Sequence, residues 1–234
     1  MNSEPTSVSK SIAIIPAIAS EFEEHGTSSP IDFVSPNTSE LKQMYTAIQD
    51  GPLNLMSSRR WWKVMDNLAL QSQFRNELDQ LAKLPVDDAD PSKGTLSFLE
   101  KEGIPQMALS LLPFVRNFII KCGERGVLLV SRGPQGLQNP NWEASALLSF
   151  PPQKRHIVAE GKSGEAVYIR HFPPLHAANI VNVTGVGDTL VGTLLVGLIR
   201  GNSLDVLINQ AQQAAIHTLA SSHAVSPMLS QMKI

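Results

Sequence analysis

The sequence feature that most constrains the fold is a glycine-rich turn between a short apolar stretch and a helix. The segment Asn182-Val-Thr-Gly-Val-Gly-Asp188 predicts a strand over Val181–Val183, a turn, and a helix over Asp188–Arg200. Gly185 and Gly187 permit backbone angles and close approaches that a Cβ would prevent. The helix that follows adds unpaired N–H groups and a positive partial charge. The turn therefore favours an anion such as a phosphoryl group.

Asp188, at the head of this helix, has two interpretations. A carboxylate gains nothing from contact with a phosphate, because like charges repel, but it can take a proton from an attacking hydroxyl. The other interpretation is a helix cap beside a packing glycine, and spacing alone leaves both open. No G-x-x-x-x-G-K-[ST] and no G-x-G-x-x-G motif occurs, so neither a P-loop nor a dinucleotide-binding oxidoreductase is predicted.

Apolar periodicity and turn residues predict helices that alternate with mostly apolar strands. The predicted strands are Ile31–Ser35, Phe118–Ile120, Val127–Ser131 and an edge strand over Ala166–Arg170. The predicted helices are 7–24 with a break near Pro16, Thr38–Ile48 with Thr38 as cap, Ser57–Leu84, Ile104–Asn117 and Leu204–Ala220. A loop is expected over Val86–Gly94 and a long surface excursion over 132–156. This order favours an α/β sandwich around a central sheet.

Composition limits the classes of protein and partner. The chain has 234 residues, 42% hydrophobic and 17% charged, which suits a single domain with a sizeable core. Its net charge of -2 predicts neither nucleic acid nor an anionic membrane as a partner. Cys122 is the only cysteine, which is consistent with a reducing, cytoplasmic compartment. No apolar run approaches the roughly 20 residues that span a bilayer, and the amino terminus is expected to be mature protein.

The glycine turn closely resembles the carboxy-terminal signature of the ribokinase-like (PfkB) sugar and nucleoside kinases. In that family a D-T-x-G-A-G-D-x-F-x-G-like stretch supplies an anion hole and the catalytic base. The resemblance implies that Asp188 is the catalytic base and that the anion hole consists of Gly185, Val186 and Gly187. Three positions depart from the commonest pattern: Asn182, Val186 and Leu190.

The segment Asn37-Thr-Ser-Glu40 resembles the N-x-x-E motif of the same family, whose polar side chains arrange magnesium-bound water and phosphate. Mg²⁺ prefers oxygen ligands and retains water, so Asn37 and Glu40, one helical turn apart, suit an indirect metal site. Taken alone, the motif is also typical of a helix cap with a solvated glutamate.

Two further segments resemble nucleotide-binding parts of the family. Lys121-Cys-Gly-Glu-Arg-Gly126 is similar to its K-L-G-x-x-G turn beside the nucleotide phosphates, which implies nucleotide-binding roles for Lys121, Gly123 and Gly126. The alternative is an ordinary hairpin with an exposed lysine. Ala211-Gln-Gln-Ala-Ala215 is similar to the helix that lines the adenine site, with Gln212 where an asparagine is frequent. By itself, such a helix indicates only good packing.

Within the family, finer similarities point to pseudouridine kinases, especially the kinase part of fungal pseudouridine-metabolising bifunctional proteins. These similarities lie in Glu4–Ser7 with Lys10, Asp32–Leu41, Val183–Asp188 and Ala224–Pro227. The resemblance implies a three-layer ribokinase-like α/β sandwich. Residues 1–234 are expected to be the carboxy-terminal portion of one PfkB-type kinase domain that lacks its amino-terminal, sugar-binding half.

The resemblance also implies an ATP- and Mg²⁺-dependent phosphotransferase. Its acceptor is expected to be a sugar or nucleoside hydroxyl, above all the 5′-hydroxyl of pseudouridine. Because the sugar-binding half is expected to be absent, a complementing chain or a homo-oligomer is the expected protein partner. The alternative is a catalytically inactive remnant that binds nucleotide or a partner chain.

Overall fold

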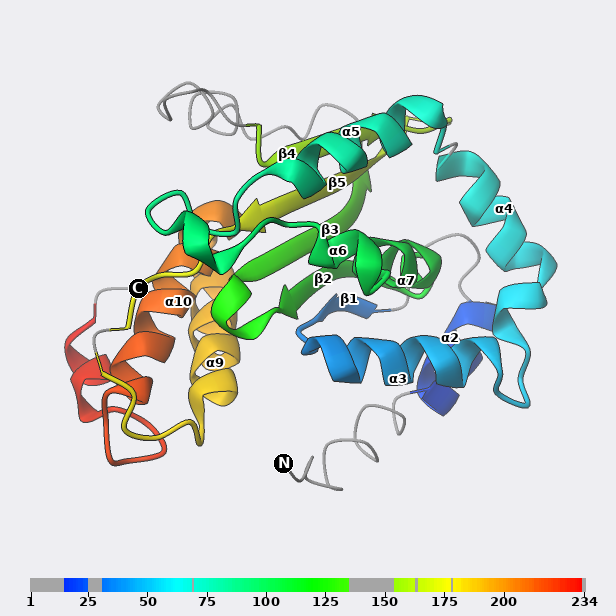
Figure 1. Cartoon of the computed structure of the whole chain (residues 1–234). Helices are drawn as coiled ribbons and strands as arrows, with labels where there is room; N and C mark the ends of the chain where they lie inside the picture. The colour runs from blue at the N-terminus through cyan, green and yellow to red at the C-terminus, as the bar shows by residue number, and fades with distance from the viewer. Residues whose placement is uncertain are drawn as a thin grey trace. The chain divides into compact units, whose positions relative to one another are not determined.

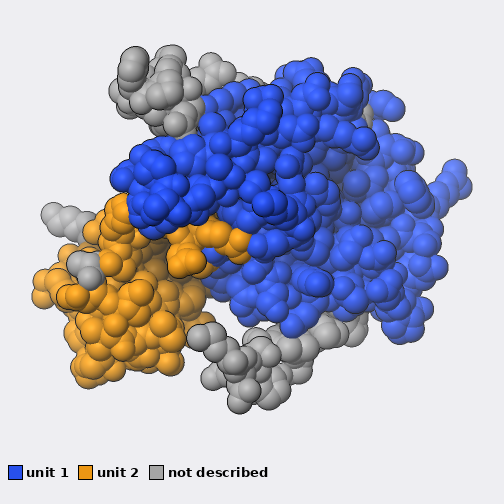
Figure 2. Space-filling view, in the orientation of Figure 1, with its two compact units in different colours: residues 1–122, 128–171 blue, residues 123–127, 172–234 orange. Residues whose placement is uncertain are grey.

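The computed structural model describes residues 15–24, 31–68, 70–134, 154–162, 164–177 and 179–232. The start of the predicted helix over 7–24 and most of the predicted excursion over 132–156 lie outside these residues. The chain folds as two compact units, which Figure 2 shows in different colours. Unit 1 consists of Met1–Cys122 and Leu128–His171, and unit 2 consists of Gly123–Val127 and Phe172–Ile234.

Within the described residues, unit 1 is built on a five-stranded mixed sheet with the order β1-β2-β3-β5-β4. Its strands are β1 (Ile31–Val34), β2 (Val115–Lys121), β3 (Val127–Pro134), β4 (His156–Glu160) and β5 (Glu165–Phe172). β1 runs parallel to β2, with Ile31 opposite Val115 and Phe33 opposite Asn117. β4 runs antiparallel to β5, with His156 opposite Arg170. The predicted α/β class is therefore confirmed.

The predicted edge strand Ala166–Arg170 forms part of β5 but lies inside the sheet, so the prediction of an edge is wrong. β4 begins at His156, where the predicted excursion ends. It pairs along the outer side of β5. As a result, β5 is buried at successive positions over 166–169, although its sequence alternates like an edge strand.

β2 and β3 supply the centre of the core. Phe118 and Ile120 on β2 and Leu128 and Val130 on β3 are fully buried. β3 is buried at successive positions, and side chains alternate between the two faces of a strand, so both faces of β3 are covered.

The helices of unit 1 are α2 (Ile15–Glu24), α3 (Thr38–Gln49), α4 (Arg59–Leu68), α5 (Ser72–Lys83), α6 (Phe98–Lys101) and α7 (Ile104–Leu111). Figure 1 shows α3, α5, α6 and α7 on one face of the sheet, and α3 contacts β2 while α5 contacts β4. The predictions of a strand at 31–35 and a helix at 38–48 are confirmed, with small shifts at their ends.

Two predicted helices are too long. The segment Ser57–Leu84 holds two helices, α4 and α5, because Gln71 adopts an extended conformation with φ of -94° and ψ of -179°. The predicted helix Ile104–Asn117 ends at Leu111. The chain then enters β2 at Val115, where pairing with β1 replaces the helical hydrogen bonds.

Unit 2 contains α9 (Val186–Ile199), which packs against α10 (Leu204–Leu219). The two helices predicted here are confirmed, with shifts of one or two residues at their ends. A Cβ added to Gly197 would lie 1.8 Å from Cδ2 of Leu207, so the glycine permits the close approach of the two helices.

The predicted strand Val181–Val183 is wrong, because this stretch has irregular backbone. The side chains of Val181 and Val183 are 61% and 72% exposed, so their apolar character does not reflect burial in a sheet.

Candidate functional site

The anion turn, defined here as Asn182–Asp188, is held at its start by the carboxyl end of α10. The N–H groups of Val181 and Asn182 both donate to the carbonyl oxygen of Leu219, at N···O distances of 2.7 and 3.2 Å. Within the turn, Oδ1 of Asn182 accepts from the Thr184 N–H at 2.9 Å, which is an Asx-type turn. These bonds take the place of the strand partner that the sequence predicts.

Gly185 is the N-cap residue of α9, and two features of the structure require a glycine there. Its φ of 77° lies in the left-handed region, which other residues rarely adopt. A Cβ at this position would lie 1.8 Å from the carbonyl oxygen of Ala224. The carbonyl oxygen of Gly185 accepts from the Thr189 N–H at 2.8 Å and so starts the helix.

The amino terminus of α9 is open, because a glycine cap has no side chain to close it. The N–H groups of Val186, Gly187 and Asp188 have no acceptor among the described residues. Unpaired N–H groups at the positive end of a helix can donate hydrogen bonds to an anion. Two of these donors, Val186 and Gly187, belong to the anion hole that the sequence predicts, and the third is Asp188 in place of Gly185.

Asp188 is the third residue of α9 and is exposed. Its carboxylate has no ion pair and no hydrogen bond to any described residue. The cap of the helix is Gly185, so Asp188 does not have the capping role that was its alternative interpretation. The carboxylate is free to accept a proton or a hydrogen bond from a bound molecule.

Asn37 and Glu40 form a capping box at the start of α3. Oδ1 of Asn37 accepts from the Glu40 N–H, and Oε2 of Glu40 accepts from the Asn37 N–H, both at 2.8 Å. Asn37 is thus the cap, and the prediction of Thr38 as the cap is wrong. Within the described residues, Nδ2 of Asn37 and Oε1 of Glu40 have no partner. These two atoms could contact a metal-bound water or a phosphate.

Lys121 lies beside this motif, because the parallel strands β1 and β2 end at the same edge of the sheet. The Lys121 N–H donates to the carbonyl oxygen of Pro36 at 2.8 Å, and Lys121 pairs with Asn37 in a parallel bridge. Ligands of α/β proteins usually bind at the carboxyl ends of parallel strands. Unit 1 therefore brings together three predicted site residues: Asn37, Glu40 and Lys121.

Gly123 and Gly126 both adopt left-handed backbone conformations, with φ of 62° and 86°. Gly123 is the first residue of a single helical turn, Gly123–Arg125, and Gly126 follows it. A Cβ on Gly126 would lie 2.2 Å from the carbonyl oxygen of Phe172, whereas one on Gly123 would meet nothing within 4 Å. Packing and turn geometry explain both glycines without a ligand, as the hairpin interpretation of this segment requires.

Gln212 is buried on α10, with 7% of its surface exposed. Its Nε2 atom has no hydrogen-bond partner among the described residues. A buried amide left without an acceptor costs about 1–3 kcal/mol. The ring nitrogens of adenine are acceptors of the kind that this donor lacks, but Nε2 is closed off from solvent, so adenine could reach it only after neighbouring groups move.

The predicted site residues thus fall into two groups, one in each unit. The group in unit 1 consists of Asn37, Glu40 and Lys121. The group in unit 2 consists of Gly123, Gly126, Gly185, Val186, Gly187, Asp188 and Gln212. Sequence reasoning missed four residues that hold the anion turn: Thr218, Leu219, Ala224 and Ser226. Ala224 and Ser226 belong to a stretch noted only for its resemblance, and a buried hydroxyl such as that of Thr218 leaves no pattern in a sequence.

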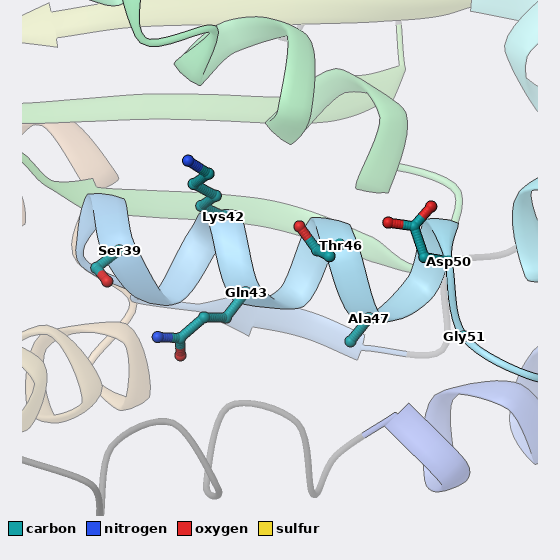
Figure 3. Close-up of a pocket in the computed structure, with 7 residues that line it drawn as sticks. All are labelled: Ser39, Lys42, Gln43, Thr46, Ala47, Asp50 and Gly51. Carbon is teal, nitrogen blue, oxygen red and sulfur yellow. The ribbon is translucent and has the colours of Figure 1, made fainter.

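A pocket of about 520 Å³ lies along α3 and involves none of the predicted site residues. Figure 3 shows its lining, which comes from α3 and the residues just after it: Ser39, Lys42, Gln43, Thr46, Ala47, Asp50 and Gly51. The lining carries one cation, Lys42, and one carboxylate, Asp50, so it has no strong preference for an anion.

Residues 97–231 match the family model described as pfkB family carbohydrate kinase. The chain belongs to the pfkB family. The matched residues include the anion turn, Lys121 and Gln212, whereas Asn37 and Glu40 precede them. The family resemblance predicted from the motifs is confirmed.

Two curated relatives of this pfkB chain are bifunctional proteins. It is 32% identical over 225 residues to a pseudouridine-metabolizing bifunctional protein of Schizosaccharomyces pombe, covering 96% of this chain and 25% of the relative. It is 36% identical over 107 residues to the bifunctional protein HldE of Yersinia pestis, covering 43% of this chain and 20% of that protein. The chain therefore spans a quarter or less of the length of these relatives.

Solved structures of ribokinases show a weaker likeness to the pfkB chain. The Arabidopsis thaliana ribokinase complexed with ribose and ATP is 16% identical, with 86% of this chain and 40% of that chain covered and a TM-score of 0.43. The Cryptococcus neoformans ribokinase in complex with ADP is 15% identical, with 91% and 47% covered and a TM-score of 0.46. Likeness at this level transfers no structural detail to this chain.

Proposed function

We propose that this chain is an ATP-dependent phosphotransferase that phosphorylates a hydroxyl group of a nucleoside or sugar. The observation that carries the proposal is the open amino terminus of α9, where three unpaired N–H groups adjoin a free carboxylate. An uncapped helix end binds phosphoryl oxygens, and a carboxylate beside it can deprotonate an attacking hydroxyl. Membership of the pfkB family supports the same reaction class.

In the proposed reaction, Asp188 accepts the proton of the attacking hydroxyl. The N–H groups of Val186, Gly187 and Asp188 donate hydrogen bonds to the oxygens of the transferring phosphoryl group, where negative charge is spread in the transition state. These donors are already ordered, because Gly185 fixes the start of the helix.

The proposed nucleotide-binding residues are Lys121, Gly123, Gly126 and Gln212. Gln212 donates its unpaired Nε2–H to the adenine ring, and Lys121 with the Gly123–Gly126 turn contacts the phosphates. Bound Mg²⁺ would neutralise phosphate charge, and Asn37 and Glu40 would hold it through water by the atoms that the capping box leaves unused. In the described ranges no three His, Cys, Asp or Glu side chains gather, so a direct protein cage for the ion is not part of the proposal.

Pseudouridine is the proposed acceptor, with its 5′-hydroxyl as the attacking group. The support is the name of the S. pombe relative, to which nearly the whole chain aligns. Another chain or a second copy of this chain is the proposed source of further acceptor contacts.

The proposed compartment is the cytoplasm. The support is the single cysteine, Cys122, which is a buried thiol, as is usual for proteins of a reducing compartment. As a separate finding, none of the helices that the structure describes could span a bilayer.

The decisive experiment measures phosphate transfer from ATP to pseudouridine, with uridine and ribose as comparison acceptors. Replacing Asp188 by Asn should lower turnover roughly 100- to 10,000-fold, because the general base is lost while the N–H groups remain. Asp66→Asn, a change at an exposed carboxylate on α4, is the matched control and should leave turnover unaltered. Turnover of Asp188→Asn within twofold of the unchanged chain would contradict the proposal.

Nucleotide binding and phosphate transfer, measured together, separate this kinase from the alternative, a protein that binds nucleotide without transfer. A ligand specific for the folded state stabilises it by about 2.7 kcal/mol at a hundredfold excess over Kd, so Mg-ATP should raise Tm. Gly187→Val should remove the rise by crowding the phosphate. A rise in Tm without transfer to any acceptor, alone or with an added acceptor-binding chain, would favour the alternative.

A further inference from the structure

The last turn of α10 contacts the chain on both sides of the anion turn. On the amino-terminal side, the carbonyl oxygen of Leu219 accepts from two N–H groups, those of Val181 and Asn182. On the carboxy-terminal side, the hydroxyl of Thr218 lies 3.0 Å from the hydroxyl of Thr189, the residue that follows Asp188. One helical turn therefore fixes the entry to the anion turn and the first turn of α9.

The Thr218 hydroxyl also bonds a third segment. The Ser226 N–H donates to Oγ1 of Thr218 at 3.3 Å, and the same segment carries the Ala224 carbonyl oxygen that excludes any Cβ at Gly185. A hydroxyl has one donor and two acceptor sites, so Thr218 can accept from Ser226 and still share a hydrogen bond with Thr189. A single oxygen atom thus joins the first turn of α9 to the segment that packs against Gly185.

All three members of this junction are shielded from water. Thr218 is 0% exposed, Ser226 is 4% exposed and Thr189 is 6% exposed. Water cannot replace the Thr218 hydroxyl at such a site, so its loss would leave the Ser226 N–H without its acceptor. Valine fills the same volume but offers no such acceptor.

We infer that Thr218 is a positioning residue for the phosphotransfer reaction. It acts through Thr189 and the Ala224–Ser226 segment to hold the carboxylate of Asp188 and the N–H groups of the anion turn in register. This inference rests on the proposed function for its catalytic consequence, whereas the junction itself is a property of the fold. Displacements of about 1 Å at a reacting group can cost a hundredfold in rate, so a residue that touches no substrate can still control turnover.

Three variants of the full chain test the inference. Thr218→Val removes the hydroxyl, and Thr218→Ser retains it at the cost of a methyl group. Thr193→Val is the matched control: Thr193 is also buried, on α9, but its hydroxyl donates to the Thr189 carbonyl oxygen one turn before it, within the same helix. Two properties are measured, amide hydrogen exchange across residues 181–190 and 221–228, and kcat and KM for phosphate transfer from Mg-ATP.

We expect Thr218→Val to speed exchange about tenfold or more in both segments, with slower kcat and little change in KM for ATP. Thr218→Ser, which keeps the hydroxyl, should show the exchange and the kcat of the unchanged chain. If packing alone mattered, the loss of the methyl group would make Thr218→Ser the more perturbed variant. Equal exchange in Thr218→Val and Thr193→Val would overturn the inference, as would a kcat unchanged by Thr218→Val in an active enzyme. If the unchanged chain transfers no phosphate, the proposed function fails by itself, and the exchange data still decide whether Thr218 holds the turn.

Discussion

Gly185 and Gly126 share a steric environment in which a backbone carbonyl oxygen occupies the space of a side chain. The oxygen is that of Ala224 in the first case and that of Phe172 in the second. Both residues also have positive φ. A resemblance to phosphate-binding motifs therefore does not distinguish these glycines from glycines required by packing, and substitution has to separate the two requirements.

Gly126→Ala should lower the free energy of unfolding by several kcal/mol, because a Cβ would lie 2.2 Å from a carbonyl oxygen that cannot rotate away. Gly123→Ala is the control, because its φ is also positive but its Cβ would meet nothing within 4 Å. This variant should lose only about 1 kcal/mol for the left-handed conformation. Urea unfolding measures both, and equal losses would show that the carbonyl contact is unimportant.

At the scale of elements, the helices of unit 2 use two glycines differently. A Cβ on Gly197 of α9 would overlap the side chain of Leu207 on α10, whereas one on Gly192 would meet nothing within 4 Å. Gly192→Ala should therefore stabilise the chain by up to about 1 kcal/mol, the usual gain of alanine over glycine within a helix.

Gly197→Ala should instead lose about 1–3 kcal/mol, because it overpacks the α9–α10 contact. Thermal unfolding of the two variants measures the difference, and the Tm of Gly192→Ala should lie above that of Gly197→Ala. The reverse order would mean that α9 and α10 are not in close contact in solution.

The elements that could be predicted from sequence are those whose boundaries are set by local chemistry. β1, α3, α9 and α10 follow from apolar runs and turn residues near their ends. The failures at 104–117, 166–170 and 181–183 have another cause, because each depends on a partner distant in sequence. Apolar residues in a short run do not reveal whether β1, β4 or the end of α10 will supply the hydrogen bonds.

The same distinction applies to the candidate site. Gly185 and Asp188 could be predicted, because a glycine turn before a helix constrains its own geometry. The residues that hold this turn could not, because the Thr218 hydroxyl and the Ala224 carbonyl oxygen act across 29 and 39 residues of sequence. A backbone carbonyl, moreover, is common to every residue type.

At the scale of the whole molecule, stability should depend on pH through His156 on β4. The pKa of His156 is lowered from 6.5 to about 4, chiefly by burial and in smaller part by the cations of Lys154 and Arg170, while Glu77 acts in the opposite direction. Between about pH 6.5 and pH 4, the His156 imidazole therefore binds a proton in the unfolded chain but stays neutral in the folded chain. The free energy of unfolding should fall as the pH drops through this window, by up to about 3 kcal/mol.

His156→Gln should flatten this dependence, because the variant has no imidazole to protonate. Urea unfolding at pH 7 and pH 5 measures the slope, with His223→Gln as the control at an exposed histidine. An unchanged slope in His156→Gln would assign the pH dependence to other groups.

α10 carries both Gln212, the proposed contact of the adenine ring, and Leu219, which anchors the anion turn. Seven residues separate them, which corresponds to a rise of about 10 Å along a rigid rod. The distance and the angle between the two contacts are therefore set by the number of residues in the helix and not by side-chain repacking. Deleting one residue between them would turn Gln212 by about 100° relative to Leu219 and shorten the span by about 1.5 Å. Nucleotide recognition should therefore tolerate many substitutions within 213–217, but no change in the length of that segment.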